Sequence, residues 1–149
     1  MALQEGTIAP DFTLMSTDGK AFNLYENQRD KPCILYFYPK DFTPGCEREA
    51  CDFRDNFKLM ENLNINVIGI STDSNETHLK FKKKFNLPFH LLSDPDSIVS
   101  KMYDAVIPFL NISKRVTYYL DEKQIIGGVY ENFFGAHLHR KRILEKINR

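Results

Sequence analysis

An uninterrupted apolar run at residues 33–38, ended by Pro39, constrains the fold more than any other feature of this sequence. Its length and its aromatic and branched side chains predict a strand that is buried on both faces, which is typical of parallel sheets. Similar runs cover residues 65–71 and, more briefly, residues 91–93. The chain therefore contains at least three strands of a parallel arrangement.

Segments with apolar residues at helical spacing separate these strands. The predicted helices cover residues 46–62, 74–85, 95–103 and 136–147, with Phe53, Phe57, Met60, Leu79, Phe81 and Phe85 among the buried positions. Turn signals at Asp18-Gly19 and at residues 121–124 predict two hairpins, over residues 10–23 and 116–130. We therefore expect an α/β fold, with a central mixed sheet flanked by helices, an N-terminal β-hairpin, and a single domain over residues 1–149.

Composition narrows the classes of function. The 149 residues include 20 basic and 20 acidic side chains, and this zero net charge argues against nucleic acid as a partner. No apolar run approaches the roughly 18–20 residues that span a membrane, and the first residues lack the pattern of a secretion signal, so we expect a cytoplasmic protein. Three cysteines are too few for a disulfide scaffold, and two close cysteines in a reducing compartment suggest metal or redox chemistry.

The chemistry is concentrated where the first buried strand gives way to a helix. Cys46 lies in the predicted first turn of that helix, where free N–H groups and the helix dipole favour a thiolate and can lower a cysteine pKa to about 7.5 or less. The Thr43 hydroxyl can both donate and accept a hydrogen bond. Pro39 and Pro44 make the loop rigid, and Gly45 permits a close approach of the backbone.

The Pro-x-x-x-Thr-x-x-Cys pattern formed by Pro39, Thr43 and Cys46 resembles the peroxiredoxin family. Cys51, which follows Cys46 after four residues, makes the chain similar to the bacterioferritin comigratory protein, or Q-type, subfamily. Further similar segments cover residues 9–14, 69–73, 91–94 and 115–121. The chain departs from the subfamily in having no tryptophan and in residues 106–114.

This resemblance implies a thioredoxin-like fold and the reduction of hydrogen peroxide and alkyl hydroperoxides to water and alcohols. Cys46 would attack the peroxide and become a sulfenic acid, and Cys51 would resolve it as an intramolecular disulfide. Arg115 would stabilise the thiolate, and Glu49 would either fix an arginine or lie on a solvated face. The resemblance also implies thioredoxin as reductant, no metal or other cofactor, and a monomer.

The spacing of the two cysteines adds a structural expectation. In an ideal helix, Cα atoms five residues apart are separated by roughly 8.6 Å, whereas a disulfide needs less than about 7 Å. The start of the helix would therefore unwind when Cys46 and Cys51 are joined. Cys33, in a buried strand, is expected only to pack, and His78 and His139 are expected to have structural roles.

Two other functions fit the same fold. A thiol-disulfide oxidoreductase usually carries Cys-x-x-Cys, which is absent here. A peroxide sensor that passes its disulfide to a partner protein could have an identical sequence. A zinc module is excluded because Cys46 and Cys51 have no second pair of ligands at ordinary spacing.

Overall fold

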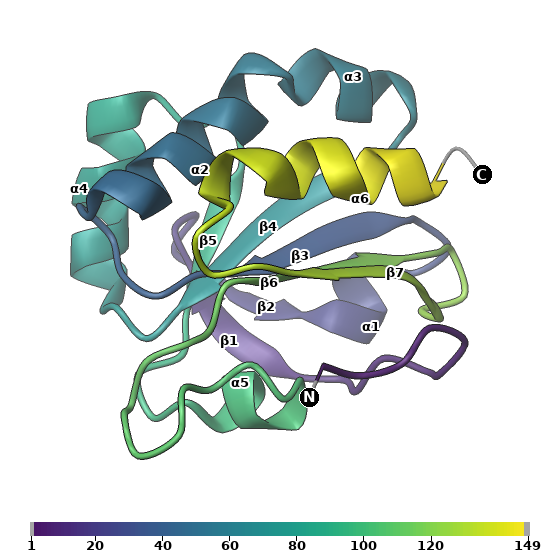
Figure 1. Cartoon of the computed structure of the whole chain (residues 1–149), viewed down its shortest axis with the longest axis horizontal. Coiled ribbons are helices and arrows are strands. Elements are labelled where there is room, and N and C mark those ends of the chain that lie inside the picture. Colours follow the sequence, from purple (N-terminus) through teal and green to yellow (C-terminus); the bar gives the residue numbers. More distant parts are fainter. Residues whose placement is uncertain (1, 148–149) are drawn as a thin grey trace.

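The predicted buried runs form the centre of one seven-stranded mixed sheet in the computed structural model, which describes residues 2–147 (Figure 1). The strand order is β2-β1-β5-β4-β3-β6-β7. The strands are β1 (Thr13–Ser16), β2 (Ala21–Asn23), β3 (Cys33–Phe37), β4 (Asn66–Ser71), β5 (His90–Ser93), β6 (Val116–Leu120) and β7 (Ile126–Glu131). Strands β3, β4 and β5 are parallel and the other pairs are antiparallel, so both predicted hairpins are confirmed.

Strand β3 lies inside the sheet, between β4 and β6, and all five of its residues are buried. Its side chains alternate between two cores because successive residues of a strand point to opposite faces. Leu35 and Phe37 contribute to one core, while Ile34 and Tyr36 contribute to the core that also contains Cys46. Burial on both faces explains why this segment reads as an uninterrupted apolar run.

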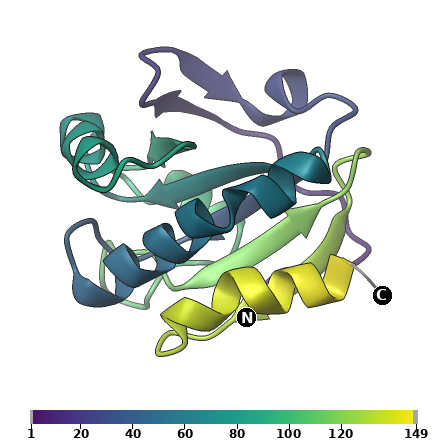
Figure 2. The ribbon, with the colours of Figure 1, turned by 90° about the horizontal axis from the view of Figure 1, so that it is seen from above.

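Helices cover both faces of the sheet, as predicted (Figures 1 and 2). One core packs against α2 (Pro44–Asp55), α3 (Phe57–Asn62), α4 (Asn75–Phe85) and α6 (His139–Ile147), which a 3-10 turn at Ala136–Leu138 precedes. The other core packs against α1 (Leu24–Asn27) and α5 (Ile98–Met102). Among residues 2–147, none of these helices has the length and apolar composition needed to cross a membrane.

The helix predicted over residues 46–62 is in fact two helices, and this prediction was wrong. Asn56 separates α2 from α3 with a φ of −114° and a ψ of 14°. Its side-chain amide donates to the Asp52 carbonyl at 2.8 Å, and its backbone N–H donates to the same oxygen at 3.2 Å. Asparagine ends helices in this way because its short side chain competes for backbone hydrogen bonds.

Two smaller predictions also fail. Leu79 was expected to face the core, but it is 46% exposed, and its neighbour His78 is fully buried in its place. The helix rotates in this way because His78 finds hydrogen-bond partners inside the protein. Helix α1 was not among the predicted helices; Asn23 caps it by accepting from the Glu26 N–H at 2.9 Å.

Candidate active site

Cys46 lies in the first turn of α2, immediately after the loop that follows β3. Thr43 is the N-cap residue with an extended backbone, and Pro44 occupies the first helical position, where its missing N–H costs nothing. The loop and helix therefore place Cys46 where the sequence predicted. Its side chain points toward the sheet and only 1% of the residue is exposed.

Two donors converge on the Cys46 sulfur. The Lys40 backbone N–H and the Arg115 Nη2 each lie 3.5 Å from Sγ. Arg115 is held in turn by its Nε, which donates to the Phe133 carbonyl at 2.9 Å. Gly45 makes this approach possible, since a Cβ at that position would lie 3.0 Å from Arg115 Nη2. The structure thus brings Arg115 and Cys46 together across a long stretch of sequence.

The sequence predicted a lowered pKa for Cys46, and this expectation is corrected. Burial raises the pKa of Cys46 above its ordinary value, because an anion loses its hydration inside the protein. The charge of Arg115, the Thr43 hydroxyl and the Lys40 N–H act in the opposite direction and moderate the rise. Ionisation of the Cys46 thiol therefore depends on these three groups, which stabilise the thiolate.

Glu49 is fully buried and forms an ion pair with Arg115, with 2.7 Å between Oε1 and Nη1. The alternative of a solvated face is therefore wrong for this residue. Burial raises the pKa of Glu49 to about 8 despite the favourable charge of Arg115. Its other oxygen, Oε2, has no hydrogen-bond partner among residues 2–147 and lies 3.6 Å from Nδ1 of the buried His139.

Thr43 is the N-cap residue but does not cap the helix with its side chain. Its hydroxyl donates to the Lys40 carbonyl at 2.7 Å, which turns the loop back on itself beside Cys46. Pro39 and Thr43 line a pocket next to the sulfur. The remaining lining residues are Gly45, Arg48, Arg115, Phe133, Phe134 and Ala136.

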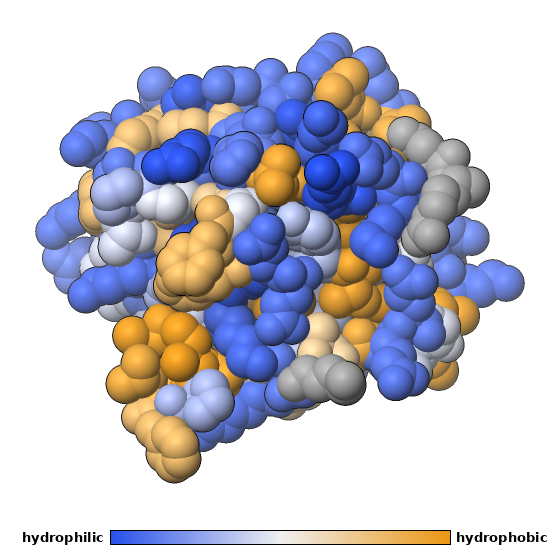
Figure 3. Space-filling model, viewed as in Figure 1, coloured by the Kyte–Doolittle hydropathy of each residue, from blue (hydrophilic) through white to orange (hydrophobic). Residues whose placement is uncertain are grey.

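The pocket mouth is apolar and adjoins open surface. Phe134 is 90% exposed and Phe133 is half-buried, so both rings are available to a bound molecule. Figure 3 shows a further apolar patch at the lower left, over the segment between α5 and β6, where Phe109 and Leu110 are exposed. That segment contains residues 106–114, which depart from the subfamily pattern, and it does not line the pocket.

Cys51 lies in the same helix as Cys46, and it is half-buried with a free thiol. Since α2 is continuous from Pro44 to Asp55, the two cysteines have the helical spacing that the sequence predicted to be too wide for a disulfide. Cys33 is buried in β3 and burial raises its pKa, which fits the predicted packing role.

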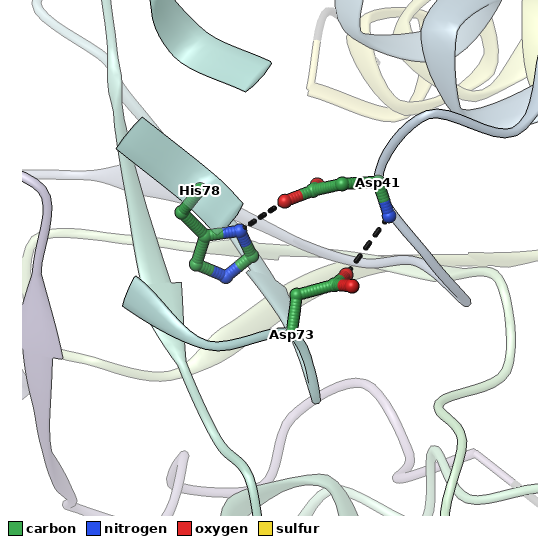
Figure 4. Close-up of side chains that lie close together, drawn as sticks. All are labelled: Asp41, Asp73 and His78. Carbon is green, nitrogen blue, oxygen red and sulfur yellow. Dashed lines mark hydrogen bonds and ion pairs between the residues drawn. The ribbon is translucent and has the colours of Figure 1, made fainter. Parts of the chain in front are cut away.

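A second polar cluster lies behind the loop that carries Lys40. Asp41, Asp73 and His78 place one oxygen or nitrogen each within 4.8 Å of one another (Figure 4). Hydrogen bonds already occupy these atoms: His78 Nδ1 lies 2.6 Å from Asp41 Oδ2, and Asp73 Oδ2 accepts from the Asp41 N–H at 2.8 Å. The arrangement is a closed hydrogen-bond network, and the donor set fits that role better than a metal site.

Several residues of the site were not predicted. Phe133, Phe134 and Ala136 follow β7 and reach the pocket only through the folding of the C-terminal segment, so no local pattern marks them. Asp41 lies in the loop before Cys46, but its burial was not predicted because an isolated acidic residue in a loop is usually exposed to solvent. Arg54 lies in the same helix as Cys46 but pairs with Asp55 at 2.9 Å and does not line the pocket.

A buried cysteine at a helix N-terminus, on a mixed sheet and beside an arginine, is an arrangement suited to thiol chemistry. A protein-family model described as the AhpC/TSA family matches residues 6–129. The chain belongs to this family, and it is a peroxiredoxin, that is, a thiol peroxidase with a thioredoxin-like fold.

Individual relatives agree with this assignment. A Coxiella burnetii protein named peroxiredoxin bcp is 41% identical over 136 residues, covering 87% of this chain and 89% of its own length. The chloroplastic peroxiredoxin Q of rice, Oryza sativa subsp. japonica, is 40% identical over 92% of this chain, which spans 63% of the rice protein. The crystal structure of the peroxidoxin BcpB from Mycobacterium tuberculosis has a TM-score of 0.91 at 30% identity, over 98% of this chain and 97% of that one.

Proposed function

We propose that Cys46 is the nucleophile that reduces hydrogen peroxide and organic hydroperoxides. The observation that carries this proposal is the pair of donors, Lys40 N–H and Arg115 Nη2, at 3.5 Å from the Cys46 sulfur beside an open pocket. Donors in this position stabilise a thiolate before attack and the charge that develops on the peroxide oxygens during it.

In the proposed reaction, the Cys46 thiolate attacks one oxygen of the hydroperoxide and the O–O bond breaks. The sulfur gains that oxygen and becomes a sulfenic acid, while the second oxygen leaves as water or an alcohol after it takes up a proton. The sulfur is oxidised by two electrons and the peroxide is reduced by two. Arg115 and the Thr43 hydroxyl are the groups available to orient the two oxygens, since both line the pocket.

The pocket also supports a role for organic hydroperoxides. Pro39, Phe133, Phe134 and Ala136 give it apolar walls, and an alkyl group would be favoured there over water. Hydrogen peroxide has no apolar part and would gain nothing from these walls. Both substrates remain within the proposal, with the organic ones bound more tightly.

We further propose that Cys51 attacks the sulfenic acid, releases water and forms a Cys46–Cys51 disulfide. This step needs the first turns of α2 to unwind, because both cysteines lie in the intact helix. A dithiol protein such as thioredoxin would then reduce the disulfide and return both thiols. A monomer suffices for this cycle, because the same chain supplies both sulfurs; the cytoplasmic location stays a prediction.

The experiment is a reaction of the reduced protein with one equivalent of hydrogen peroxide, followed by intact and peptide mass spectrometry. The wild-type protein should lose two hydrogens and yield a Cys46–Cys51 peptide. The Cys51→Ser variant should instead gain oxygen at Cys46, and Cys46→Ser should leave the peroxide unconsumed.

A matched control is Cys33→Ala, which removes the third thiol from a buried strand. This variant should form the same disulfide as the wild-type protein. Peroxide consumption that persists in Cys46→Ser would overturn the assignment of the nucleophile. A wild-type protein that gains oxygen without a disulfide would overturn the role of Cys51 alone.

A further inference from the structure

The loop between β3 and α2 holds two of the contacts that shape the Cys46 site, and both involve the Lys40 peptide unit. The Lys40 N–H faces the Cys46 sulfur at 3.5 Å, and the Lys40 carbonyl accepts from the Thr43 hydroxyl at 2.7 Å. The position of this one residue's backbone therefore affects both the sulfur and the threonine. Its side chain is exposed and cannot fix that position by packing.

The same loop contains a costly backbone conformation. Phe42 has a φ of 63°, in the left-handed region that residues other than glycine rarely adopt. Such a conformation is strained and persists only where surrounding contacts hold it. The Phe42 ring packs edge-to-face against Phe81 of α4, with 5.2 Å between centroids, which is one such contact.

Asp41, between Lys40 and Phe42, supplies the others and is 2% exposed. Its carboxylate accepts from the Tyr38 hydroxyl at 2.6 Å and contacts His78 Nδ1 at 2.6 Å. Its backbone N–H donates to Asp73 Oδ2 at 2.8 Å (Figure 4). These three hydrogen bonds tie Asp41 to residues that follow β3 and β4 and to α4, and none of them involves the helix that carries Cys46.

His78 completes this attachment from a fully buried position on α4. Its Nε2 donates to the Leu92 carbonyl of β5 at 3.0 Å, since a carbonyl oxygen can only accept. Its Nδ1 faces the Asp41 carboxylate, so one proton is shared between Nδ1 and Oδ2. A buried pair of this kind contributes little net stability compared with apolar packing.

We propose that Asp41 and His78 are positioning residues for peroxide reduction: their buried pair, with the Tyr38 hydroxyl, fixes the Lys40 peptide against Cys46. This inference rests on the proposed role of Cys46 as the nucleophile. Neither residue touches the pocket, so both act through the backbone of the loop. The pair also links the loop to α4 and β5, which remain in place if the start of α2 unwinds.

The test compares variants that remove the pair with one that keeps its hydrogen bonds. Asp41→Ala and His78→Leu should lower the rate constant of Cys46 oxidation by hydrogen peroxide by about tenfold or more, since small displacements at a reacting centre have effects of this size. They should also raise the pH at which Cys46 is alkylated by iodoacetamide. Asp41→Asn should stay within about threefold of the wild-type rate, because an amide can accept from Tyr38 and donate to His78.

The rates are measured by competition with a haem peroxidase, because the chain has no tryptophan to report on the reaction. Tyr118→Phe is the matched control: it removes a buried hydroxyl that donates to the Tyr103 carbonyl at 2.6 Å, in the core on the other face of the sheet. This variant should lose stability without any change in the Cys46 rate or its pH profile.

The inference is overturned if Asp41→Ala and His78→Leu fold and keep the wild-type rate and alkylation profile. Should these variants not fold, Tyr38→Phe decides, because it deletes one hydroxyl and should still slow oxidation about threefold with a shifted profile; an unchanged rate and profile would overturn the inference. A wild-type Cys46 that does not react with peroxide at all would instead contradict the proposed function.

Discussion

Each of the two groups that contact Cys46 has a buried histidine nearby, and the two histidines differ in their hydrogen-bond partners. His78 meets the Asp41 carboxylate at 2.6 Å, next to the Lys40 peptide. His139 meets the Thr117 hydroxyl at 2.8 Å and lies 3.6 Å from Glu49, which pairs with Arg115. Neither side chain is exposed.

The hydrogen-bond partners determine which ring nitrogens of each histidine carry a proton. At His78 both nitrogens face groups that accept, so the ring shares a proton with the carboxylate. At His139, Nε2 donates to the Asn132 carbonyl and Nδ1 accepts from the Thr117 hydroxyl, which describes a neutral ring. Burial lowers the pKa of His139 to about 4, and the charge of Arg115 acts in the same direction. Equal burial of one residue type thus leads to two electrostatic roles.

The largest predicted effect follows from removing Arg115, the cation that pairs with Glu49 near His139. Arg115→Met should lower the rate of Cys46 oxidation by about 10²- to 10³-fold, the usual cost of removing one donor to developing negative charge. It should also raise the Cys46 pKa further, because Arg115 is the strongest of the groups that lower it. Competition kinetics between about pH 6 and 9, the range in which thiols commonly titrate, would measure both the rate of Cys46 oxidation and the pH at which that rate rises.

The control for this variant is Arg54→Met, which removes a cation that pairs with Asp55 rather than with the site. Its rate of Cys46 oxidation should match the wild-type rate. An Arg115→Met protein that reacts within about threefold of the wild-type rate would contradict the electrostatic role assigned to this side.

The next effect is on stability and depends on pH. The Glu49 pKa is raised from 4.5 to about 8, so the folded protein holds a proton there that the unfolded chain releases. This stabilisation is complete below pH 4.5 and is lost as the pH rises toward 8. Glu49→Gln should remove this pH dependence, because the amide has no proton to release in that window.

His139 has the opposite dependence. Its pKa is lowered from 6.5 to about 4, so stability is complete above pH 6.5 and falls as the pH decreases toward 4. His139→Asn should abolish that fall. Urea unfolding of both variants and the wild-type protein from pH 4 to 8 separates the two contributions, and parallel curves for all three proteins would contradict them.

The smallest effect converts one histidine environment toward the other. Thr117→Val removes the hydroxyl that donates to His139 and leaves the Glu49 carboxyl, at 3.6 Å, as the nearest polar group to Nδ1. The His139 pKa should then rise, and the protein should lose about 1 kcal/mol of stability with the lost hydrogen bond. NMR titration of the His139 ring measures the change, and an unaltered titration would show that Thr117 does not keep the ring neutral.

The parts of the fold that could be predicted are those with a strong local pattern. The run that became β3 and the Asp18-Gly19 turn are confirmed because burial on both faces and turn geometry each leave a mark on neighbouring residues. The break at Asn56 was not predicted, because the apolar spacing of Phe53, Phe57 and Met60 continues across it. Periodicity reports the buried face of a segment and does not report where its hydrogen bonds are interrupted.

The site divides in the same way. Pro39, Thr43 and Cys46 lie close together in the sequence. In the structure Pro39 and Thr43 line one pocket, and the Lys40 peptide contacts both the Thr43 hydroxyl and the Cys46 sulfur. The pairing of Asp41 with His78 depends on the packing of α4 across 37 residues, and the environment of Glu49 depends on a strand and a helix from the other end of the chain. The raised pKa of Cys46 was missed for a related reason, since helix position is local and desolvation is not.

The interruption at Asn56 gives α2 the character of a separate cooperative unit. If the hydrogen bonds of α2 are lost, those of α3 need not be lost with them, because α3 starts separately at Phe57 and its Met60 is buried in the core. Within α2, Phe53 stacks on Tyr36 of β3 with 4.6 Å between ring centroids, close to the end of the helix. Amide protons of α2 should therefore be able to exchange with solvent through openings that leave α3 in place.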